Sequence, residues 1–257
     1  MANSKERKGQ PVHVPPGRRN ARPARLMFVI GFSLIVLMLS LPSVLTTEEA
    51  PQREESKFAI YVDGKEIGSE QFSILTSADA VDSTSVVSFR DPGKSRKKVR
   101  METQLSMDSR FMPRSYRVRT DVEGQKGTIT GTFAPDEATF DYQGSGNPMR
   151  RGLMVGNRYI LLDTNIFHHF IFIARLYDLR AGGSQTVEAV IPQELDSGKL
   201  KVSEIGLEKL SIRGKKMNLH HLTADSGMLL INLWIDDQKI LYKIELPARK
   251  IEVIRGR

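Results

Sequence analysis

The 257-residue chain contains no cysteine, which excludes disulfides, thiolate metal ligands, cysteine nucleophiles and the lipid-modified cysteine of a bacterial lipoprotein. Seven of its 38 basic side chains and one of its 30 acidic side chains fall in residues 1–25, so the other 31 basic and 29 acidic side chains leave the rest of the chain nearly neutral. A nucleic-acid-binding domain carries a basic face of its own, so this distribution argues against a nucleic-acid partner.

Residues 1–25 form a basic segment with several prolines, and its composition predicts a disordered tail. Residues 26–45 carry no charged side chain, and twenty helical residues at 1.5 Å each span roughly 30 Å, the thickness of the bilayer core. The sequence therefore predicts a basic cytoplasmic tail (1–25) followed by a transmembrane signal anchor (26–45), with the lipid bilayer as a partner.

The charges on either side of residues 26–45 set the expected orientation. Basic residues precede the segment and Glu48, Glu49, Glu54 and Glu55 follow it, so the positive-inside rule places the C-terminal domain outside the cytoplasm. A cleaved signal peptide is the alternative, although the preceding polar region is long and no Ala-x-Ala site follows. Both interpretations predict an extracytoplasmic domain, and the anchor places it at a bacterial inner membrane.

Residues 46–56 are polar and predict a linker, after which the extracytoplasmic β-rich domain is expected over 57–257. Alternating apolar residues on both sides of Asp63-Gly64 predict a β-hairpin, because this dipeptide suits a two-residue turn with positive φ angles. Short alternating runs follow, which favours an antiparallel sheet with one face in water. These predicted strands cover 85–90, 97–106, 115–122, 127–133 and 138–142.

One segment breaks the strand pattern. Residues 164–179 are apolar nearly all round, follow a polar Asp163-Thr164 pair that can cap a helix, and precede Ala181-Gly182-Gly183. The sequence predicts an apolar helix here, too short to cross a membrane, that either fills the concave side of the sheet or lies across its mouth. A buried pair of strands is the alternative.

Strand patterns resume after the predicted helix and end in a meander. The predicted strands cover 186–191, 199–205, 208–213, 216–224, 228–235, 240–246 and 251–255. The expected fold is mainly β, an antiparallel open barrel or wrapped sheet with one inserted apolar helix, preceded by a single transmembrane helix.

Three stretches carry a resemblance: Tyr61-Val62-Asp63-Gly64-Lys65-Glu66-Ile67-Gly68, Leu161-Leu162-Asp163-Thr164-Asn165 with Phe167-His168-His169, and Leu233-Trp234-Ile235-Asp236-Asp237 with the closing strand. With these turn-and-strand signatures, most of residues 57–257 resembles exported, β-rich bacterial proteins of unknown function. That family is similar in general design to periplasmic lipoprotein carriers, in which a half-open sheet with an inserted helix encloses an apolar groove. The resemblance implies a ligand groove but carries no known active site.

The predicted helix supplies the candidate groove residues, which are Ile166, Phe167, Phe170, Ile171 and Ile173. Their apolar area must be buried, either in a closed core or along a groove that binds an apolar ligand.

Two His-His pairs, His168-His169 and His220-His221, are the features that suggest a metal. Each pair could supply one inward ligand, with a carboxylate from Asp163 or Asp225. No His-x-x-x-His or His-Glu-x-x-His spacing supports such a site, so we expect no cofactor and no metal, with His168, His169 and Asp163 as the weak metal candidates.

The sequence contains no nucleophile elbow, phosphate loop or dinucleotide fingerprint, so no catalytic residue can be named. We expect a membrane-anchored, non-enzymatic domain that binds an apolar ligand, a lipid or an envelope protein. An envelope hydrolase or metal enzyme using His168 and His169 is one alternative, and a scaffold without a small ligand is another.

Overall fold

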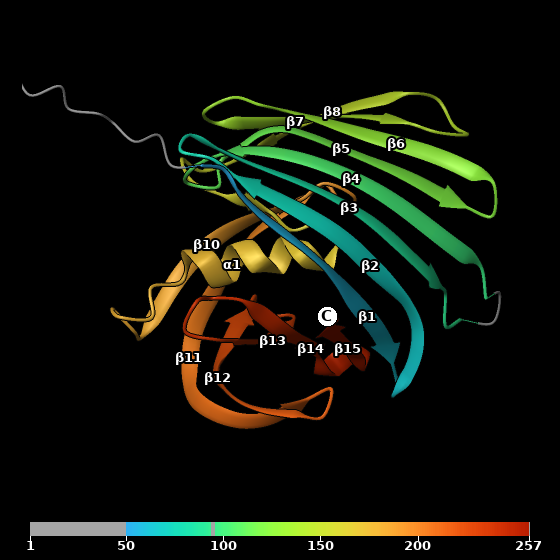
Figure 1. Ribbon diagram of the computed structural model, residues 1–257. Coiled ribbons are helices and arrows are strands. Elements are labelled where there is room, and N and C mark those ends of the chain that lie inside the picture. Colours follow the sequence, from blue (N-terminus) through green and yellow to red (C-terminus); the bar gives the residue numbers. More distant parts are fainter. Residues whose placement is uncertain (1–49, 94–95, 257) are drawn as a thin grey trace, which may run out of the picture. The chain divides into compact units, whose positions relative to one another are not determined.

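A computed structural model describes residues 50–93 and 96–256, which form one continuous, strongly curved sheet around a short helix (Figure 1). The strand order is β8-β7-β6-β5-β4-β3-β2-β1-β15-β14-β13-β12-β11-β10-β9, so the N- and C-terminal strands β1 and β15 are neighbours in the middle. Every pairing is antiparallel except the short parallel pair of β9 and β10. The sheet does not close, which confirms the predicted open, mainly β architecture.

The strands range in length from two residues in β9 to 17 residues in β11. Their bounds are β1 Gln52–Val62, β2 Lys65–Thr76, β3 Ala80–Arg90, β4 Lys98–Asp108, β5 Pro113–Val122, β6 Gln125–Phe133, β7 Glu137–Gln143, β8 Met149–Met154, β9 Ile160–Leu161, β10 Ser184–Ile191, β11 Asp196–Ile212, β12 Lys215–Asp225, β13 Leu230–Ile235, β14 Leu241–Leu246 and β15 Ile251–Arg255.

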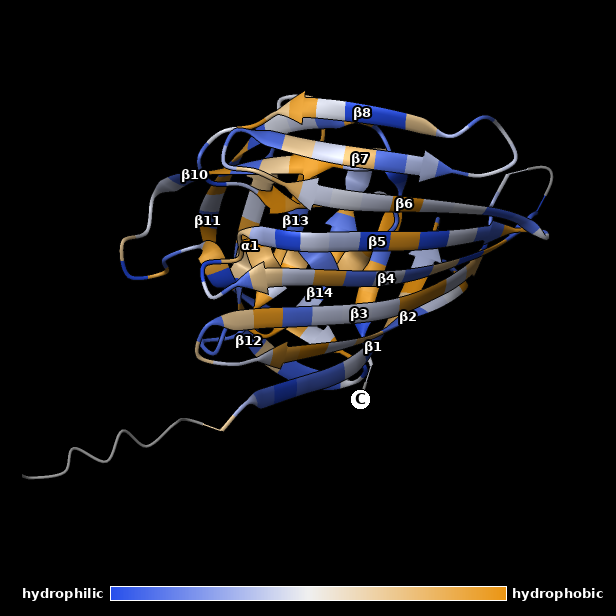
Figure 2. Cartoon of the chain, turned by 90° about the horizontal axis from the view of Figure 1, so that it is seen from above, coloured by the Kyte–Doolittle hydropathy of each residue, from blue (hydrophilic) through white to orange (hydrophobic). Residues whose placement is uncertain are grey.

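The alternating sequence patterns decide which side chains enter the concave side. Val81, Val87, Met101, Leu105 and Val118 are at most 2% exposed. The residues directly next to them on β3, β4 and β5 are mostly polar and face outward, as the alternating colours in Figure 2 show. The predicted hairpin at Asp63-Gly64 is confirmed, with φ angles of 50° and 74° at the two turn residues.

Strand β1 begins at Gln52, inside residues 46–56, which were predicted to form a linker. Its first residues are hydrophilic (Figure 2), so the sequence offered no apolar alternation there. The strand is nevertheless held by ion pairs of Glu54, whose carboxylate lies 2.5 Å from Arg175 of the helix and 2.7 Å from Arg255 of β15. The linker boundary is therefore corrected to end before Gln52.

Strand β11 is one strand of 17 residues where the sequence predicted two. The break in the pattern comes from a β-bulge between Glu204 and Gly206, and Gly206 has a φ of +145° that favours glycine. Beyond the bulge, Leu210 and Ile212 pack on the convex side with Leu219 and Trp234 in a second small apolar cluster. Strands β8 and β9 were not predicted.

The apolar segment is helical but shorter than predicted. A 3-10 turn, η1 (Phe167–His169), leads into α1 (Phe170–Leu176). Residues 163–166 are not helical because Asn165 has a φ of +62° and the Asp163 side chain accepts the N–H groups of Thr164 and Gln193. The residue at the N-cap of η1 is Ile166, which makes no side-chain capping bond, so the predicted capping role of Asp163 or Thr164 is wrong.

The helix lies inside the curve of the sheet, between β1–β5 and β11–β15 (Figure 1). Ile166, Ile171, Phe172, Ile173 and Ala174 are at most 1% exposed and belong to the main core together with residues of both halves of the sheet. The helix therefore fills the concave side, the first of the two placements considered from the sequence.

The predicted tail (1–25) and signal anchor (26–45) lie outside the described residues. Within residues 50–93 and 96–256, no helix is both long enough and apolar enough to cross a bilayer.

The close approach of β2 and β3 at Gly68 gives a test of the fold. A Cβ added there would lie 2.2 Å from the Ser88 carbonyl oxygen and 2.5 Å from the Phe89 Cα, and both atoms are backbone that cannot move freely. We expect Gly68→Ala to lower the free energy of unfolding by about 1–3 kcal/mol, the usual cost of overpacking. Denaturant unfolding measures this loss.

Gly146→Ala is the matched control, because no atom lies within 4 Å of a Cβ at that loop position. The fold is contradicted at β2–β3 if both variants unfold at the same denaturant concentration as the unmodified chain.

Candidate functional site

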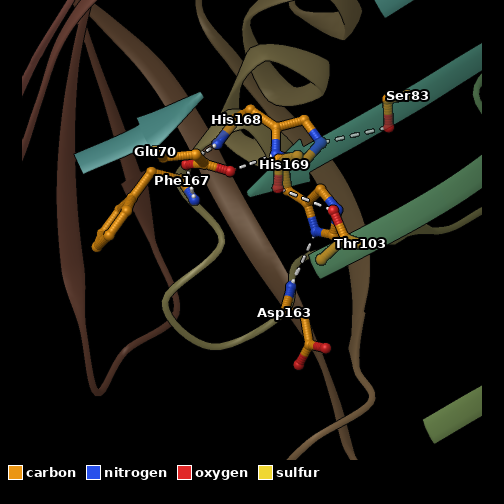
Figure 3. A network of polar contacts seen from close by, with 8 residues as sticks. Glu70, Ser83, Thr103, Asp163, Phe167, His168 and His169 are labelled. Atoms are coloured by element: carbon orange, nitrogen blue, oxygen red, sulfur yellow. Dashed lines mark hydrogen bonds and ion pairs between the residues drawn. The ribbon is translucent and has the colours of Figure 1, made fainter. Parts of the chain in front are cut away.

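A fully buried carboxylate holds the start of the helical segment to the sheet (Figure 3). Glu70 on β2 is 0% exposed, and its Oε2 accepts the main-chain N–H groups of Phe167 at 2.8 Å and His168 at 3.0 Å. Its Oε1 accepts from Nδ1 of His168 at 2.6 Å. These bonds satisfy N–H groups at the start of the helical segment, which have no intrahelical partner.

His168 continues the network into β3. Its Nε2 lies 3.3 Å from Oγ of Ser83, and its ring stacks on Phe72 with centroids 5.8 Å apart. Ser85 follows Ser83 on the inner face of β3, and it shares a hydrogen bond of 2.9 Å with Thr103 of β4. The inner face of β2, β3 and β4 thus carries a polar stripe beneath η1 (Figure 3).

Asp163 anchors the chain just before η1. Its carboxylate accepts a very short hydrogen bond from the Tyr116 hydroxyl on β5 and accepts the N–H of Gln193 at 3.0 Å. Burial raises the pKa of Asp163, although its hydrogen bonds act in the opposite direction. Burial, followed by the charge of Asp163, raises the pKa of Tyr116 well above its ordinary value, so the phenol stays a neutral donor.

His169 is neutral in this environment. Burial and then the neighbouring His168 hold its pKa well below the ordinary value, and its Nδ1 accepts the Asp163 N–H at 3.2 Å. Its Nε2 therefore carries the proton, and this atom has no hydrogen-bond partner among the described residues. A buried donor without a partner costs free energy, so the position of His169 is set by packing against Tyr116 and Phe172.

Glu70, His168 and Ser83 are connected in the order of a catalytic triad: carboxylate, imidazole and hydroxyl. Such a serine must reach a substrate carbonyl, but Ser83 is 1% exposed and both partners are 0% exposed. In this arrangement the network cannot meet a substrate, and its effect is to fix the helix in the sheet.

The predicted groove residues lie in and around the filled concave side. Ile166, Phe167, Ile171 and Ile173 are at most 4% exposed, and Phe170 is half-buried against the main core. None of them lines the surface pocket beside β10 or the smaller one formed by β3, β4 and β5.

The metal candidates His168, His169 and Asp163 are close in space, but their polar atoms face other partners. The Asp163 carboxylate points to Tyr116 and Gln193, while both nitrogens of His168 and Nδ1 of His169 are directed to Glu70, Ser83 and the Asp163 N–H. Within residues 50–93 and 96–256, no group of three or more His, Asp or Glu side chains could hold a metal ion.

The second histidine pair, His220-His221, lies elsewhere, on β12. His220 is held between Glu204 at 2.6 Å and Asp237 at 2.9 Å. His221 faces the convex side, where it bonds to Glu208 at 2.7 Å and stacks on Trp234 with centroids 4.6 Å apart. The two neighbouring histidines thus point to opposite faces of β12, as expected for a strand.

A pocket of about 270 Å³ lies at the start of β9, beside the C-terminal residue of α1. Its lining comes from the segment before β9, from α1, from β10 and from β11: Arg158, Tyr159, Ile160, Leu176, Gln185, Thr186, Val187, Glu188 and Lys199. Sequence analysis missed this site, because β9 has only two residues and nothing in their pattern marks a strand.

No family model and no curated protein matches the chain. Among solved structures, it is similar to a β-barrel-like protein of a domain of unknown function, DUF1849, from Brucella abortus, with 12% identity, a TM-score of 0.51 and coverage of 80% of this chain and 95% of that one. A DUF1089 family protein from Pseudomonas aeruginosa matches 70% of this chain and 90% of its own length at 12% identity, with a TM-score of 0.44. The first likeness shows a shared fold, which agrees with the β-rich architecture expected from the sequence.

The Glu70 network predicts a large and specific loss of stability. Glu70→Ala leaves three buried donors without an acceptor, two main-chain N–H groups and Nδ1 of His168. At about 1–3 kcal/mol for each buried donor left unpaired, we expect a loss of at least about 3 kcal/mol in the free energy of unfolding. Urea unfolding followed by far-UV circular dichroism measures it.

Glu66→Ala on the same strand is the control, since Glu66 is exposed and bonds Tyr61 at 3.3 Å. Equal and small losses in the two variants would show that Glu70 does not hold the helix.

The contacts of His220 predict a pH dependence. Desolvation lowers its pKa, but the hydrogen bonds to Glu204 and Asp237 and their charges outweigh this, so the net pKa is raised above 6.5. A raised pKa in the folded state stabilises the fold fully below the unfolded value and loses this contribution as the pH rises through the folded value. The free energy of unfolding should therefore decrease as the pH rises from 6.5 through the pKa of His220 in the folded state. In His220→Gln this decrease should be smaller. An unchanged pH profile in the variant would contradict the assignment.

Proposed function

We propose that the chain is a non-enzymatic, membrane-anchored domain on the outer side of a bacterial inner membrane and that it binds an envelope protein. The observation that supports this most is the filled concave side: η1 and α1 occupy the space in which a carrier would hold an apolar ligand. The anchor and its orientation rest on the uncharged run 26–45 and the basic residues before it.

Binding an acyl chain on the concave side would require the helix to leave. Ile166, Phe172 and Ile173 are each 0% exposed, and each such side chain contributes roughly 1.5–3 kcal/mol when buried. Displacement would also break the three hydrogen bonds to Glu70. An incoming apolar ligand would have to compensate for both losses, so we favour a partner that contacts the outer surface.

The distal half of β11 offers a surface suited to a protein partner. Strand β10 pairs with β11 only up to Ser203, so residues 204–212 have a strand neighbour, β12, on one side and none on the other. Ile205 and Leu207 lie on this stretch and are 62% and 66% exposed. An edge with unpaired main-chain groups and apolar side chains is suited to the addition of an extended segment from another protein.

A hydrolase is the second candidate, because Glu70, His168 and Ser83 have the bonding order of a triad. It would need an opening that brings a substrate to Ser83, which is buried in the arrangement described above. The binding proposal therefore accounts for the network without a further conformational step.

Site-specific photocrosslinking in intact cells tests the proposal. A photoreactive residue in place of Leu207 should give a discrete adduct with one envelope protein, and the same residue in place of Arg117 on the exposed outer face of β5 should not. In spheroplasts, added protease should degrade the domain while residues 1–25 stay protected.

Three results would contradict the proposal. The first is a crosslink pattern that is the same at both positions or yields a second copy of this chain. The second is protection of the domain from external protease. The third is labelling by a fluorophosphonate that disappears in Ser83→Ala, which would support the hydrolase instead.

A further inference from the structure

The pocket at the start of β9 is formed by a gap in the sheet. Strand β9 pairs with β10 only at Ala189 and Val190, so no strand covers β10 along residues 184–188. Residues 185–188 line the pocket, together with Leu176, the last residue of α1. Strand residues, apolar side chains and charged side chains therefore line the same pocket.

The acidic and basic side chains of the pocket differ in whether they already have a partner. Glu188 already accepts the Gly156 N–H at 3.0 Å, and it forms no ion pair with Lys199 although the two residues are in register on β10 and β11. Neither Lys199 nor Arg158 forms an ion pair with any carboxylate of residues 50–93 and 96–256. Two available cations thus face one carboxylate that is already hydrogen-bonded, which favours an anionic ligand.

The remaining lining suits a short apolar group. Ile160, Leu176 and Val187 contribute hydrocarbon surface, and Tyr159 has a buried hydroxyl with no hydrogen-bond partner among the described residues. Burial raises the pKa of Tyr159 to about 12, so its hydroxyl remains a neutral donor. A volume of about 270 Å³ is slightly below the roughly 300–1,000 Å³ of sites for drug-sized ligands.

We propose that this pocket binds a small anionic amphiphile, a carboxylate or phosphate monoester with a short hydrocarbon chain. Arg158 and Lys199 bind the anionic group at the rim, and the hydrocarbon chain lies against Leu176, Ile160 and Val187. The site is separate from the edge of β11 that contacts a protein partner, so it adds a ligand to the proposed function and does not depend on it.

Calorimetric titration of the full chain in phosphatidylcholine nanodiscs tests this proposal. The probes are hexanoate and hexyl phosphate, with hexanol as the uncharged probe of the same chain and inorganic phosphate as the anion without a chain. We expect the better of the two anionic amphiphiles to bind at least about tenfold more tightly than hexanol and than inorganic phosphate, since a charge-assisted hydrogen bond is strong enough for a factor of this size. Their order of affinity distinguishes the carboxylate from the phosphate class.

Variants locate the binding. Arg158→Gln and Lys199→Gln should each weaken the binding of the better probe about tenfold, and the double variant should abolish it. Lys201→Gln is the matched control, because Lys201 is exposed on the same strand but does not line the pocket. Thermal unfolding of each variant shows that these exposed substitutions leave the fold intact.

The proposal is overturned if neither anionic amphiphile binds, if hexanol binds as tightly as the anions, or if the double variant binds like the Lys201→Gln control. Inorganic phosphate that binds as tightly as hexyl phosphate would also overturn it, because the apolar lining would then have no part in recognition.

Discussion

The structure depends on one buried carboxylate, that of Glu70, which holds an apolar segment inside a curved sheet. Residues 166–174 are too apolar to remain in water, and the concave side of a sheet this curved needs side chains to fill it. Burial also removes water from the first N–H groups of the segment, and Glu70 replaces that water with two main-chain hydrogen bonds and one to the His168 ring. Without that acceptor, the same burial would be strongly unfavourable.

Because the helix fills the concave side, the binding surfaces proposed above lie at the edges of the sheet. Because β9 has only two residues, a pocket remains beside β10 just before β9 begins, and where β10 stops before β11, an apolar strand edge remains. The two margins differ in chemistry: the pocket carries free cations, while the edge of β11 carries Ile205 and Leu207. The binding surfaces proposed above are therefore consequences of strands of unequal length around a closed core.

Much of this fold could be predicted from the sequence because most of its strands have one buried and one solvent-exposed face, which gives an alternating sequence pattern. The hairpin at Asp63-Gly64 and the closing strand Ile251–Arg255 follow from turn chemistry and alternation. The predictions failed where tertiary contacts override local pattern. A polar segment is a strand at the start of β1 because it pairs with β2, and Glu54 adds ion pairs to Arg175 and Arg255. A bulge at Gly206 hides the continuity of β11.

The candidate site was less predictable than the fold. The sequence singled out His168 and His169, yet the main partner of His168, Glu70, is 98 residues away along the chain and stands in an ordinary alternating strand. The pocket residues Arg158 and Lys199 are likewise brought together by strand order alone. Such pairs carry no local signal, because long-range register and not spacing makes them neighbours.

Hydrogen exchange of the main-chain amides of residues 167–174, in the full chain with and without added lipid, tests the central claim most directly. A helix fixed in the core should exchange only through global unfolding, so these amides should be as slow as those of β2 and β3 and should not respond to lipid. Amides in this segment that exchange much faster than those of β2, or that become faster when lipid is added, would show that the helix leaves the concave side and would contradict the account.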